Sequence, residues 1–418
     1  MDTIQETYKE TKIGKIPKEW EVVKLGDVVK YSQGIQVDLD LQKYESCEGY
    51  IKFLRIENYT QLSQDFRYVP IPSKDDKIIS KNDIVVVRYG ASAGTVGRGF
   101  DGVLANNLFK VIPNEKLDNG FLFRYLSSLY SYLQSLMSGG AMPALNFGML
   151  NLLYTPLPPI KEQKKISKIL STVDDQISLT EKIIEKSKEL KKGLMQKLFS
   201  EGIGHTEFKD TKIGRIPRDW AITQLGELCE VITKGTTPTT NGFSYLEDGI
   251  NFVKVESIDS FGGFIEKMFA YVGEDCHKSF KRSQLQEGDI LISIAGALGR
   301  TAIVTNNILP ANTNQAVGIL RLEDKSFNQF IKYFLDSNYL QKFIERVNVA
   351  SAQANLNLGH LNKFHIAFPS LNEQKKIVEI LSEADAKIEK EQSKKEKLEE
   401  LKKGLIQQLL TGKKRVKV

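Results

Sequence analysis

The sequence has few of the residues that build metal centres and disulfide frameworks. It contains three cysteines and four histidines in 418 residues. Cys47, Cys229 and Cys276 are far apart and form no Cys-x-x-Cys pair, which argues against a zinc ribbon and against a set of disulfides. His360 and His365 are five residues apart and lack the glutamate of a His-Glu-x-x-His site. We therefore expect no metal site in this chain.

Long apolar runs are also absent from the sequence. No run approaches the roughly 20 residues that cross a bilayer, and the N-terminus lacks the basic-then-apolar order of a secretory signal. We expect a cytoplasmic protein without a membrane partner. The formal net charge is +6, but Lys413, Lys414, Arg415 and Lys417 in the basic tail 413–418 supply four of these charges. Charge alone does not indicate a nucleic-acid partner, and the tail is interpreted as solvated, although such tails can strengthen phosphate contacts.

The motifs of several enzyme classes are missing. There is no Gly-x-x-x-x-Gly-Lys-Ser/Thr loop, no Gly-x-Gly-x-x-Gly fingerprint and no Asn/Asp-Pro-Pro-Tyr/Phe tetrapeptide of adenine methyltransferases. Residues 90–94, Gly-Ala-Ser-Ala-Gly, fit the nucleophile elbow of hydrolases, but 95–99 is a poor helix start and the related segment 296–300 has no serine. A glycine turn is the favoured interpretation. We expect no catalytic residue and no cofactor held by this chain.

What the sequence does contain is an internal repeat. Residues 11–20, Thr-Lys-Ile-Gly-Lys-Ile-Pro-Lys-Glu-Trp, return as 211–220, Thr-Lys-Ile-Gly-Arg-Ile-Pro-Arg-Asp-Trp, with seven identical and three conservative positions. Shorter matches pair Leu-Gly-Asp at 25–27 with Leu-Gly-Glu at 225–227, and Asp-Ile-Val-Val at 83–86 with Asp-Ile-Leu-Ile at 289–292. The chain is therefore a duplication of one unit.

The strongest match ends each half. Pro-Pro-Ile-Lys-Glu-Gln-Lys-Lys-Ile at 158–166 corresponds to Pro-Ser-Leu-Asn-Glu-Gln-Lys-Lys-Ile at 369–377. After each proline, core-type positions recur with spacings of four and three, which is typical of a heptad seam. This pattern predicts two helices, over 156–202 and 369–412, each about 60 Å long. The seam residues expected to pair the helices or hold a partner are Ile166, Leu170, Val173, Ile177, Leu194, Leu198, Ile377, Leu381, Ile388, Leu405 and Leu409.

The two predicted helices are expected to cover each other's seams. Equivalent helices related by a two-fold axis perpendicular to them run antiparallel, which carries one globular part to each end. The alternative is that each helix folds back on its own globular domain. Residues 1–20 have no helix before them, whereas 203–220 follow the first helix directly. The symmetry is complete if 1–20 dock near residue 412.

The globular parts, 21–155 and 221–368, are expected to be α/β. Strand-like runs at 51–56 and 84–87 have counterparts at 251–255 and 290–293, and each part then carries one helix-like stretch, 121–137 or 327–347. The predicted order is an N-terminal segment 1–20, a globular domain 21–155, a helix 156–202, the repeated segment 203–220, a globular domain 221–368, a helix 369–412 and the tail 413–418.

Matching loops of the two globular parts are rich in amide, hydroxyl and basic side chains. Arg, Asn and Gln bind the edges of guanine and adenine, while Ser, Thr and backbone amides hold phosphates. Such residues also fill ordinary turns, and Asn146 and Asn357 can simply cap the next helix. The residues selected for DNA contact are Gln33, Gln36, Arg55, Arg88, Ser92, Asn106, Asn107, Lys234, Thr236, Thr237, Lys254, Arg300, Asn312, Asn314, Gln315 and Gln353.

With these features together, the chain resembles the specificity subunit of type I restriction-modification enzymes over essentially its whole length. The motifs that carry the resemblance are the proline-bounded Glu-Gln-Lys-Lys-Ile helix starts at 158–166 and 369–377 and the repeated Ile-Gly-x-Ile-Pro-x-x-Trp segments. The resemblance implies two target recognition domains separated by two long antiparallel helices that form a coiled coil with pseudo-two-fold symmetry. It implies that each domain reads one half of a bipartite site in double-stranded DNA.

The resemblance also implies partners. Two methyltransferase subunits would dock on the helices and carry S-adenosylmethionine, two restriction subunits would use ATP and magnesium, and the specificity subunit would itself be non-catalytic. Lys164, Lys165, Lys375 and Lys376 are candidates for partner or phosphate contact, although a solvated helix face explains them equally well. The competing hypotheses are a coiled-coil adaptor whose globular ends bind proteins and, from residues 90–94, a hydrolase.

Overall fold

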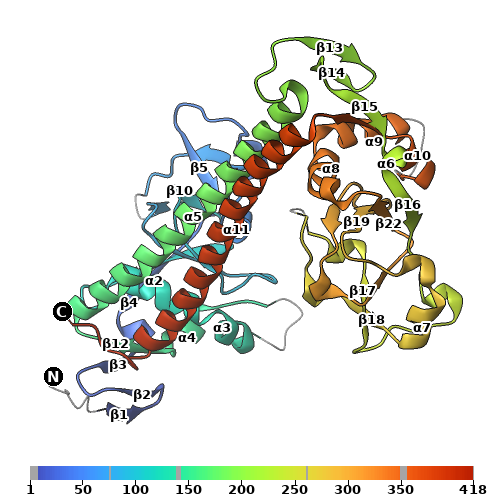
Figure 1. Ribbon diagram of the computed structural model, residues 1–418. Coiled ribbons are helices and arrows are strands. Elements are labelled where there is room, and N and C mark those ends of the chain that lie inside the picture. Colours follow the sequence, from blue (N-terminus) through green and yellow to red (C-terminus); the bar gives the residue numbers. More distant parts are fainter. Residues whose placement is uncertain (1–7, 75–76, 138–142, 260–261, 349–354, 418) are drawn as a thin grey trace. The chain divides into compact units, whose positions relative to one another are not determined.

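The computed structural model describes residues 8–74, 77–137, 143–259, 262–348 and 355–417 (Figure 1). The chain divides into two compact units, one made of residues 1–180 and 394–418 and the other of residues 181–393. Each unit contains the start of one long helix and the end of the other, because the boundaries fall inside α5 (Ile160–Glu201) and α11 (Leu371–Leu409). The prediction of a duplicated fold of mixed helices and strands with two long helices is confirmed.

Both long helices begin and end at the signals in the sequence. At 42 and 39 residues, α5 and α11 are about 63 Å and 58 Å long. α5 starts directly after Pro159, and α11 starts two residues after Pro369, so each proline lies where a missing backbone N–H costs little. Gly202 follows α5 with a φ of 65°, and Gly412 lies just beyond α11 with a φ of 70°. Glycine adopts this left-handed conformation without strain and so ends each helix.

The first unit contains three kinds of sheet. An antiparallel sheet has the strand order β4-β11-β8-β9, a mixed sheet has the order β6-β5-β10-β7, and β1-β2 and β3-β12 form two-stranded ribbons. The elements are β1 (Tyr8–Thr11), β2 (Gly14–Pro17), β3 (Glu21–Lys24), β4 (Val29–Gln33), β5 (Tyr50–Leu54), α1 (Ile56–Thr60), β6 (Arg67–Pro70), β7 (Ile78–Ile79), β8 (Ile84–Val87), β9 (Val96–Gly97), β10 (Gly102–Leu104), β11 (Leu108–Pro113), α2 (Asn119–Ser128), α3 (Tyr130–Leu136), α4 (Phe147–Asn151) and β12 (Tyr154–Leu157).

The second unit repeats this plan. Its antiparallel sheet has the order β16-β22-β19-β20, its mixed sheet the order β18-β17-β21, and its ribbons are β13-β14 and β15-β23. The elements are β13 (Phe208–Thr211), β14 (Gly214–Pro217), β15 (Ala221–Gln224), α6 (Leu225–Leu228), β16 (Cys229–Lys234), β17 (Ile250–Val253), β18 (Ala270–Val272), α7 (Glu274–Ser279), β19 (Ile290–Ser293), β20 (Thr301–Ile303), β21 (Ala311–Thr313), β22 (Val317–Leu322), α8 (Asn328–Leu335), α9 (Asn338–Asn348), α10 (Leu358–Asn362) and β23 (His365–Phe368).

The strand β8 separates two cores in the first unit. All four of its residues are buried. Successive side chains of a strand point to opposite faces. Accordingly Ile84 and Val86 join the core that holds α2, while Val85 and Val87 join a core beside the mixed sheet. This explains why the run is continuously apolar and not alternating. The equivalent strand β19 divides its neighbours in the same way.

The prediction of a single helix in each globular part is wrong, because the structure has two consecutive helices in each of these stretches. Residues 121–137 fall in α2 and α3, and residues 327–347 in α8 and α9. A serine lies at each break. The Ser128 hydroxyl donates to the Tyr125 carbonyl at 2.7 Å, and the Ser337 hydroxyl donates to the Phe334 carbonyl at 2.5 Å. Such local bonds compete with the helical ladder.

The two long helices run antiparallel within each unit. In the first unit, Ile166 and Leu170 near the start of α5 share a core with Leu409 and Leu410 at the end of α11. In the second unit, Ile377 and Leu381 near the start of α11 share a core with Leu198 and Phe199 at the end of α5. Phe199 and Leu410 lie beside the predicted heptad seam. Every seam residue named from the sequence is buried or half-buried.

Candidate nucleic-acid interface

Three loops of each unit meet at one edge of its antiparallel sheet. Gln33, at the end of β4, lies opposite Phe109 of β11, and Leu108 lies opposite Val87 at the end of β8. The loops that leave β4 and β8 therefore lie beside the loop that precedes β11. In the second unit, the pairing of Lys234 with Gly318 and of Ser293 with Val317 gathers the equivalent loops.

A hydrogen-bonded network joins four of the predicted residues in the first unit. The Arg88 guanidinium donates to the side-chain oxygen of Gln33 at 2.8 Å, and the Gln33 amide donates to the Asn106 carbonyl. The Asn106 amide donates to the side-chain oxygen of Gln36 at 3.0 Å. Lys77, which the sequence analysis did not select, adds a cation by donating to the Gln33 carbonyl at 3.1 Å. Gln36 and Asn106 remain exposed at the edge.

An open hollow of about 440 Å³ adjoins this network. Its polar lining residues are Gln36, Gln42, Arg55, Glu57, Arg67, Asn106 and Asn107. Arg55 forms an ion pair with Glu57 at 2.8 Å, and the Arg67 guanidinium lies 3.9 Å from the ring centroid of Tyr44, which is 71% exposed. Nε of Arg55, Nε of Arg67 and Oδ1 of Asn107 are buried without a hydrogen-bond partner among the described residues. These three atoms, two donors and one acceptor, thus have hydrogen-bonding capacity that no described residue uses.

A glycine lets the loop after β4 cross close to its neighbour. A Cβ on Gly34 would lie 2.1 Å from the Ala105 carbonyl oxygen, and a Cβ on the equivalent Gly235 would lie 2.0 Å from the Thr313 carbonyl oxygen. The Gly34 amide donates to the Leu108 carbonyl at 2.9 Å. Because only glycine fits, both sequences carry it inside loops that otherwise differ.

The second unit places a different set of groups at its sheet edge. Lys234 and Gln315 are exposed, while Thr236, Thr237 and Asn314 are half-buried. Arg282, not selected from the sequence, reaches the Thr236 hydroxyl at 3.4 Å. Lys254 forms an ion pair with Glu256 at 2.9 Å, which repeats the Arg55–Glu57 pair of the first unit.

Two residues selected from the sequence lie away from this group, and a third lies outside the described residues. Asn312 is completely buried, and its side chain is bonded to Nδ1 of His277 at 2.5 Å and to the Ser283 hydroxyl at 3.1 Å, so it braces the loop from inside. Arg300 donates to the Ile258 carbonyl at 3.0 Å. Gln353 lies outside the described residues.

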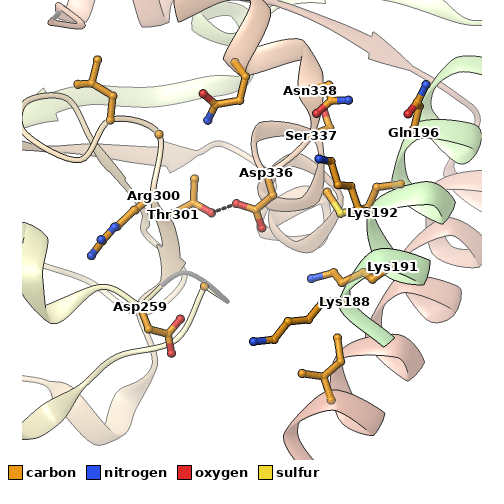
Figure 2. A pocket seen from close by; sticks show the side chains of 16 residues that line it. Lys188, Lys191, Lys192, Gln196, Asp259, Arg300, Thr301, Asp336, Ser337 and Asn338 are labelled. Carbon is orange, nitrogen blue, oxygen red and sulfur yellow. Dashed lines mark hydrogen bonds between the residues drawn. The ribbon is translucent and has the colours of Figure 1, made fainter. Parts of the chain in front are cut away.

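Arg300 lines a pocket next to the end of α5. Figure 2 shows Arg300 and Asp259 on one side of this pocket and Lys188, Lys191 and Lys192 of α5 on the other. In Figure 2 the guanidinium of Arg300 points away from the lysines of α5, in keeping with its bond to the Ile258 carbonyl, and it is not part of the group formed by Thr236 and its neighbours.

The loop of the suspected nucleophile elbow connects two strands. Ser92 lies between β8 and β9, and the Thr95 amide donates to the Ser92 carbonyl at 3.0 Å. A nucleophile elbow requires a helix after the serine. The hydrolase interpretation is therefore wrong, and the glycine turn is confirmed by the positive φ of Gly90 and Gly94, 87° and 86°.

The simple interpretation of two asparagines is confirmed. Oδ1 of Asn146 accepts a bond from the Met149 amide at 2.9 Å, and Oδ1 of Asn357 accepts one from the His360 amide at 2.7 Å. These are helix N-caps. Within the described ranges there is no group of three or more His, Cys, Asp or Glu side chains that could hold a metal ion, and no helix there is long and apolar enough to cross a membrane.

A buried carboxylate joins the repeated segment to the start of a long helix in each unit. Glu162 of α5 accepts a bond from the Trp20 indole at 3.0 Å and two bonds from the Arg415 guanidinium, at 2.8 and 3.0 Å. The expectation that the tail 413–418 is simply solvated is wrong for Arg415, because it also binds Glu19 at 2.7 Å. The Tyr8 hydroxyl donates to the Lys413 carbonyl at 3.1 Å, so the first hairpin lies against the end of the chain.

The second unit forms the same joint with a histidine in place of the arginine. Glu373 of α11 accepts a bond from the Trp220 indole at 3.0 Å, another from the Ile203 amide at 2.8 Å, and contacts Nε2 of His205 at 2.9 Å. The identical tryptophan and glutamate of each repeat thus bind each other and hold the repeated segment to the start of a long helix. Both motifs are evident in the sequence, but neither indicates that the tryptophan of one binds the glutamate of the other.

A second duplicated contact ties the helix pair to the globular domain. In the first unit Asp174 of α5 binds Lys402 of α11 at 2.7 Å and Arg124 of α2 at 2.5 Å. In the second unit Asp385 of α11 binds Lys191 of α5 at 2.6 Å and the Tyr333 hydroxyl of α8 at 2.8 Å. Burial alone would raise the pKa of Asp174, but the bonds from Lys402 and Arg124 outweigh it and leave the pKa lowered.

Comparison with known proteins decides the family. Type I restriction modification DNA specificity domains match residues 17–189 and again residues 217–400. The chain belongs to the specificity subunits of type I restriction-modification systems. It is 32% identical to the MjaVIII specificity subunit of Methanocaldococcus jannaschii over 99% of this chain and 97% of that one. It is 24% identical to the EcoBI specificity subunit of Escherichia coli over 71% of this chain and 65% of that one.

Solved structures of related proteins have the same fold as this specificity subunit. The S subunit of a type I restriction-modification system from M. genitalium matches with a TM-score of 0.59 and 18% identity, over 93% of this chain and 96% of that one. A chain from a study of complex assembly and conformational transition in the type I R-M system matches with a TM-score of 0.57 and 19% identity, over 95% and 99%. The two specificity domains are the two halves found by duplication in the sequence.

Proposed function

We propose that each unit of this specificity subunit reads one half of a bipartite site in double-stranded DNA. The observation that carries the proposal is the sheet edge: equivalent loops meet there in both units, and they present different polar and basic groups. Amides and guanidinium groups at such an edge are suited to base edges, whereas hydroxyl and ammonium groups are suited to phosphates.

The first unit offers the clearer chemistry for reading bases. Gln36 and Asn106 carry exposed amides, which pair with adenine N6 and N7. Arg67 lines the same hollow, and arginine pairs with guanine O6 and N7. In the second unit Lys234 and Thr236 occupy the corresponding loop and favour contacts with phosphate. Since the two sets differ, the two half-sites should differ in sequence.

The long helices are proposed to set the distance between the half-sites and to dock two methyltransferase subunits. S-adenosylmethionine would then be held by those subunits, and ATP and magnesium by two restriction subunits. The chain itself would be non-catalytic and would act by placing its partners on DNA. Support comes from the similarity to specificity subunits and from the duplicated helix motifs.

Two measurements test this proposal. Fluorescence anisotropy with duplex DNA, with and without a methyltransferase partner, should show binding that weakens steeply as salt rises, because phosphate contacts release counterions. A coiled-coil adaptor would show no salt-dependent binding. Methylated-adenine mapping of the host genome should reveal a two-part motif that disappears when the gene is deleted, and a motif that persists after deletion would refute the proposal.

A further inference from the structure

The two hairpins of the repeat have the same exposed surface. β1-β2 and β13-β14 share one register, and the burial pattern is identical from Thr11 to Trp20 and from Thr211 to Trp220. Charge is preserved at each exposed charged position of the repeat. These pairs are Glu10 with Asp210, Lys12 with Lys212, Lys15 with Arg215, Lys18 with Arg218 and Glu19 with Asp219.

The fold explains the buried part of this likeness but only some of the exposed part. In the first unit Glu19 binds Arg415 at 2.7 Å, and Lys12 donates to the Tyr154 hydroxyl at 2.7 Å. Ile16 and Trp20 are buried in the core, and the Thr11 hydroxyl closes the turn by donating to the Gly14 carbonyl at 2.7 Å. Exposed charges such as Lys15, 74% exposed, add little to stability. A duplicated surface under no further constraint is free to diverge at such positions.

Exposed charge is less well preserved beyond the hairpin, where Asp27 and Glu227 still correspond but the other exposed charges of residues 21–30 do not. Exposed charges of the first unit at Glu21, Lys24 and Lys30 correspond to Ala221, Gln224 and the oppositely charged Glu230 of the second unit. The sheet edges proposed to read DNA also differ between the units. The exposed charges of the hairpins are therefore preserved for something that both units share and that is not the half-site sequence.

An apolar groove lies beside the tip of each hairpin. In the first unit Lys12 and Ile13 line a groove of about 620 Å³ together with Tyr132 and Tyr154. In the second unit the equivalent residues line a groove of about 280 Å³. Those residues are Lys212, Ile213, Tyr339 and His365. Each hairpin thus places a lysine and an isoleucine at the rim of a groove large enough for an apolar side chain.

We propose that each hairpin and its groove dock one copy of the same partner subunit. The proposal rests on the function proposed above, which supplies a partner present in two copies, the methyltransferase subunit. The partner's contact surface should be acidic and should carry an apolar side chain for the groove, because each repeat holds four cations and two carboxylates between residues 8 and 19 or 208 and 219. Two preserved surfaces on one chain match two identical partners.

Binding to the DNA backbone is the competing use of these cations. The two preserved carboxylates of each hairpin oppose it, because phosphate repels them. The position opposes it too, since the hairpins precede the start of β4 and β16, whereas the proposed DNA loops follow the ends of these strands.

Charge reversal on the hairpins tests the proposal. Lys15→Glu with Lys18→Glu alters the first unit, and Arg215→Glu with Arg218→Glu alters the second. All four side chains are exposed, so the fold should be retained. Native mass spectrometry with the methyltransferase subunit counts the copies bound. Each altered hairpin should lower the affinity of its own site about tenfold or more, so that one copy remains bound at limiting concentration, and the combined variant should bind neither.

A matched control is Lys24→Glu with Lys30→Glu, which makes the same charge change at positions that the two units do not share. This variant should still bind two copies. The proposal is overturned if the hairpin variants bind two copies with the affinity of the unaltered chain, or if they lose DNA binding in the isolated chain and keep both partners. If the unaltered chain binds no methyltransferase subunit, the proposed function itself fails.

Discussion

Replacement of Arg415 by alanine should destabilise the first unit strongly, although Arg415 lies four residues from the end of the chain. Its guanidinium makes two hydrogen bonds to Glu162 and one to Glu19. The Glu162 side chain is only 1% exposed, and its other partner is the Trp20 indole. The bond to Glu162 is also the main reason why the pKa of Arg415 is raised. Arg415→Ala leaves this carboxylate buried with a single neutral donor.

The structure sets the size of the effect. Removing one partner of a buried ion pair costs about 3–5 kcal/mol. The Arg415 side chain is 25% exposed and the Trp20 bond persists, so we expect a loss of stability somewhat below this range, about 2–3 kcal/mol. The matched variant is His205→Ala in the second unit. Glu373 there is 12% exposed and keeps two hydrogen-bond donors, so its loss should be about 1 kcal/mol.

The two tryptophans of the chain allow each unit to be followed separately. Trp20 and Trp220 are both buried and lie one in each unit, so Trp220→Phe leaves a signal from the first unit and Trp20→Phe one from the second. Urea unfolding is monitored by tryptophan fluorescence. The free energy of unfolding should fall more for Arg415→Ala in the Trp220→Phe background than for His205→Ala in the Trp20→Phe background. An unchanged midpoint for Arg415→Ala, or a loss no greater than that of His205→Ala, would refute the reasoning.

Three further perturbations follow from the structure. Asp174→Asn should cost about 2 kcal/mol at neutral pH. The pKa of Asp174 in the folded chain is lowered from 3.8, so the ionised carboxylate stabilises the fold above about pH 4 and this stabilisation is lost as the pH falls through the folded pKa. The difference in the free energy of unfolding between the variant and the unaltered chain, measured in urea, should therefore shrink in acid. A difference that stays constant with pH would contradict this. Gly34→Ala should displace the loop after β4, lower stability by about 1–3 kcal/mol and weaken DNA binding, and unaltered thermal unfolding would count against the close approach. Deletion of seven residues from each of α5 and α11 should shorten the spacer of the methylated motif and leave both half-sites unchanged; altered half-sites would contradict the ruler role.

The sequence predicts the long helices well because their signals are local. A heptad pattern, a proline before each helix and a glycine after it need no tertiary information. The break between α2 and α3 was missed because the apolar pattern continues through it, while the deciding bond belongs to Ser128. The hairpin at residues 8–17 was not predicted, although Thr11 and Gly14, which form its turn, are visible in the sequence. The repeated segment indicates duplication but has no alternating apolar pattern that would indicate strands.

The sequence predicts the sheet edge only in part. The sequence pairs the equivalent loops of the two halves correctly. It does not predict which of their side chains face outward, because that depends on the register of the strands and on packing against distant segments. Asn312 is buried because His277 and Ser283 bind it. Arg67 and Lys77 reach the edge from elements with no sequence signal of their own. Arg415 had no signal either, because its partner Glu162 is 253 residues away.

The most direct test of the two-domain account is to alter the reading surface of one unit and map methylation. Gln36→Ala with Arg67→Ala removes two polar groups from the hollow of the first unit and leaves the second unit, the hairpins and the long helices unaltered. Methylated-adenine mapping should show relaxed sequence preference in one half of the motif, by about 1–3 kcal/mol per lost base contact, with the other half and the spacer unchanged. Relaxation of both halves together, or of neither, would contradict the claim that each unit reads its own half-site.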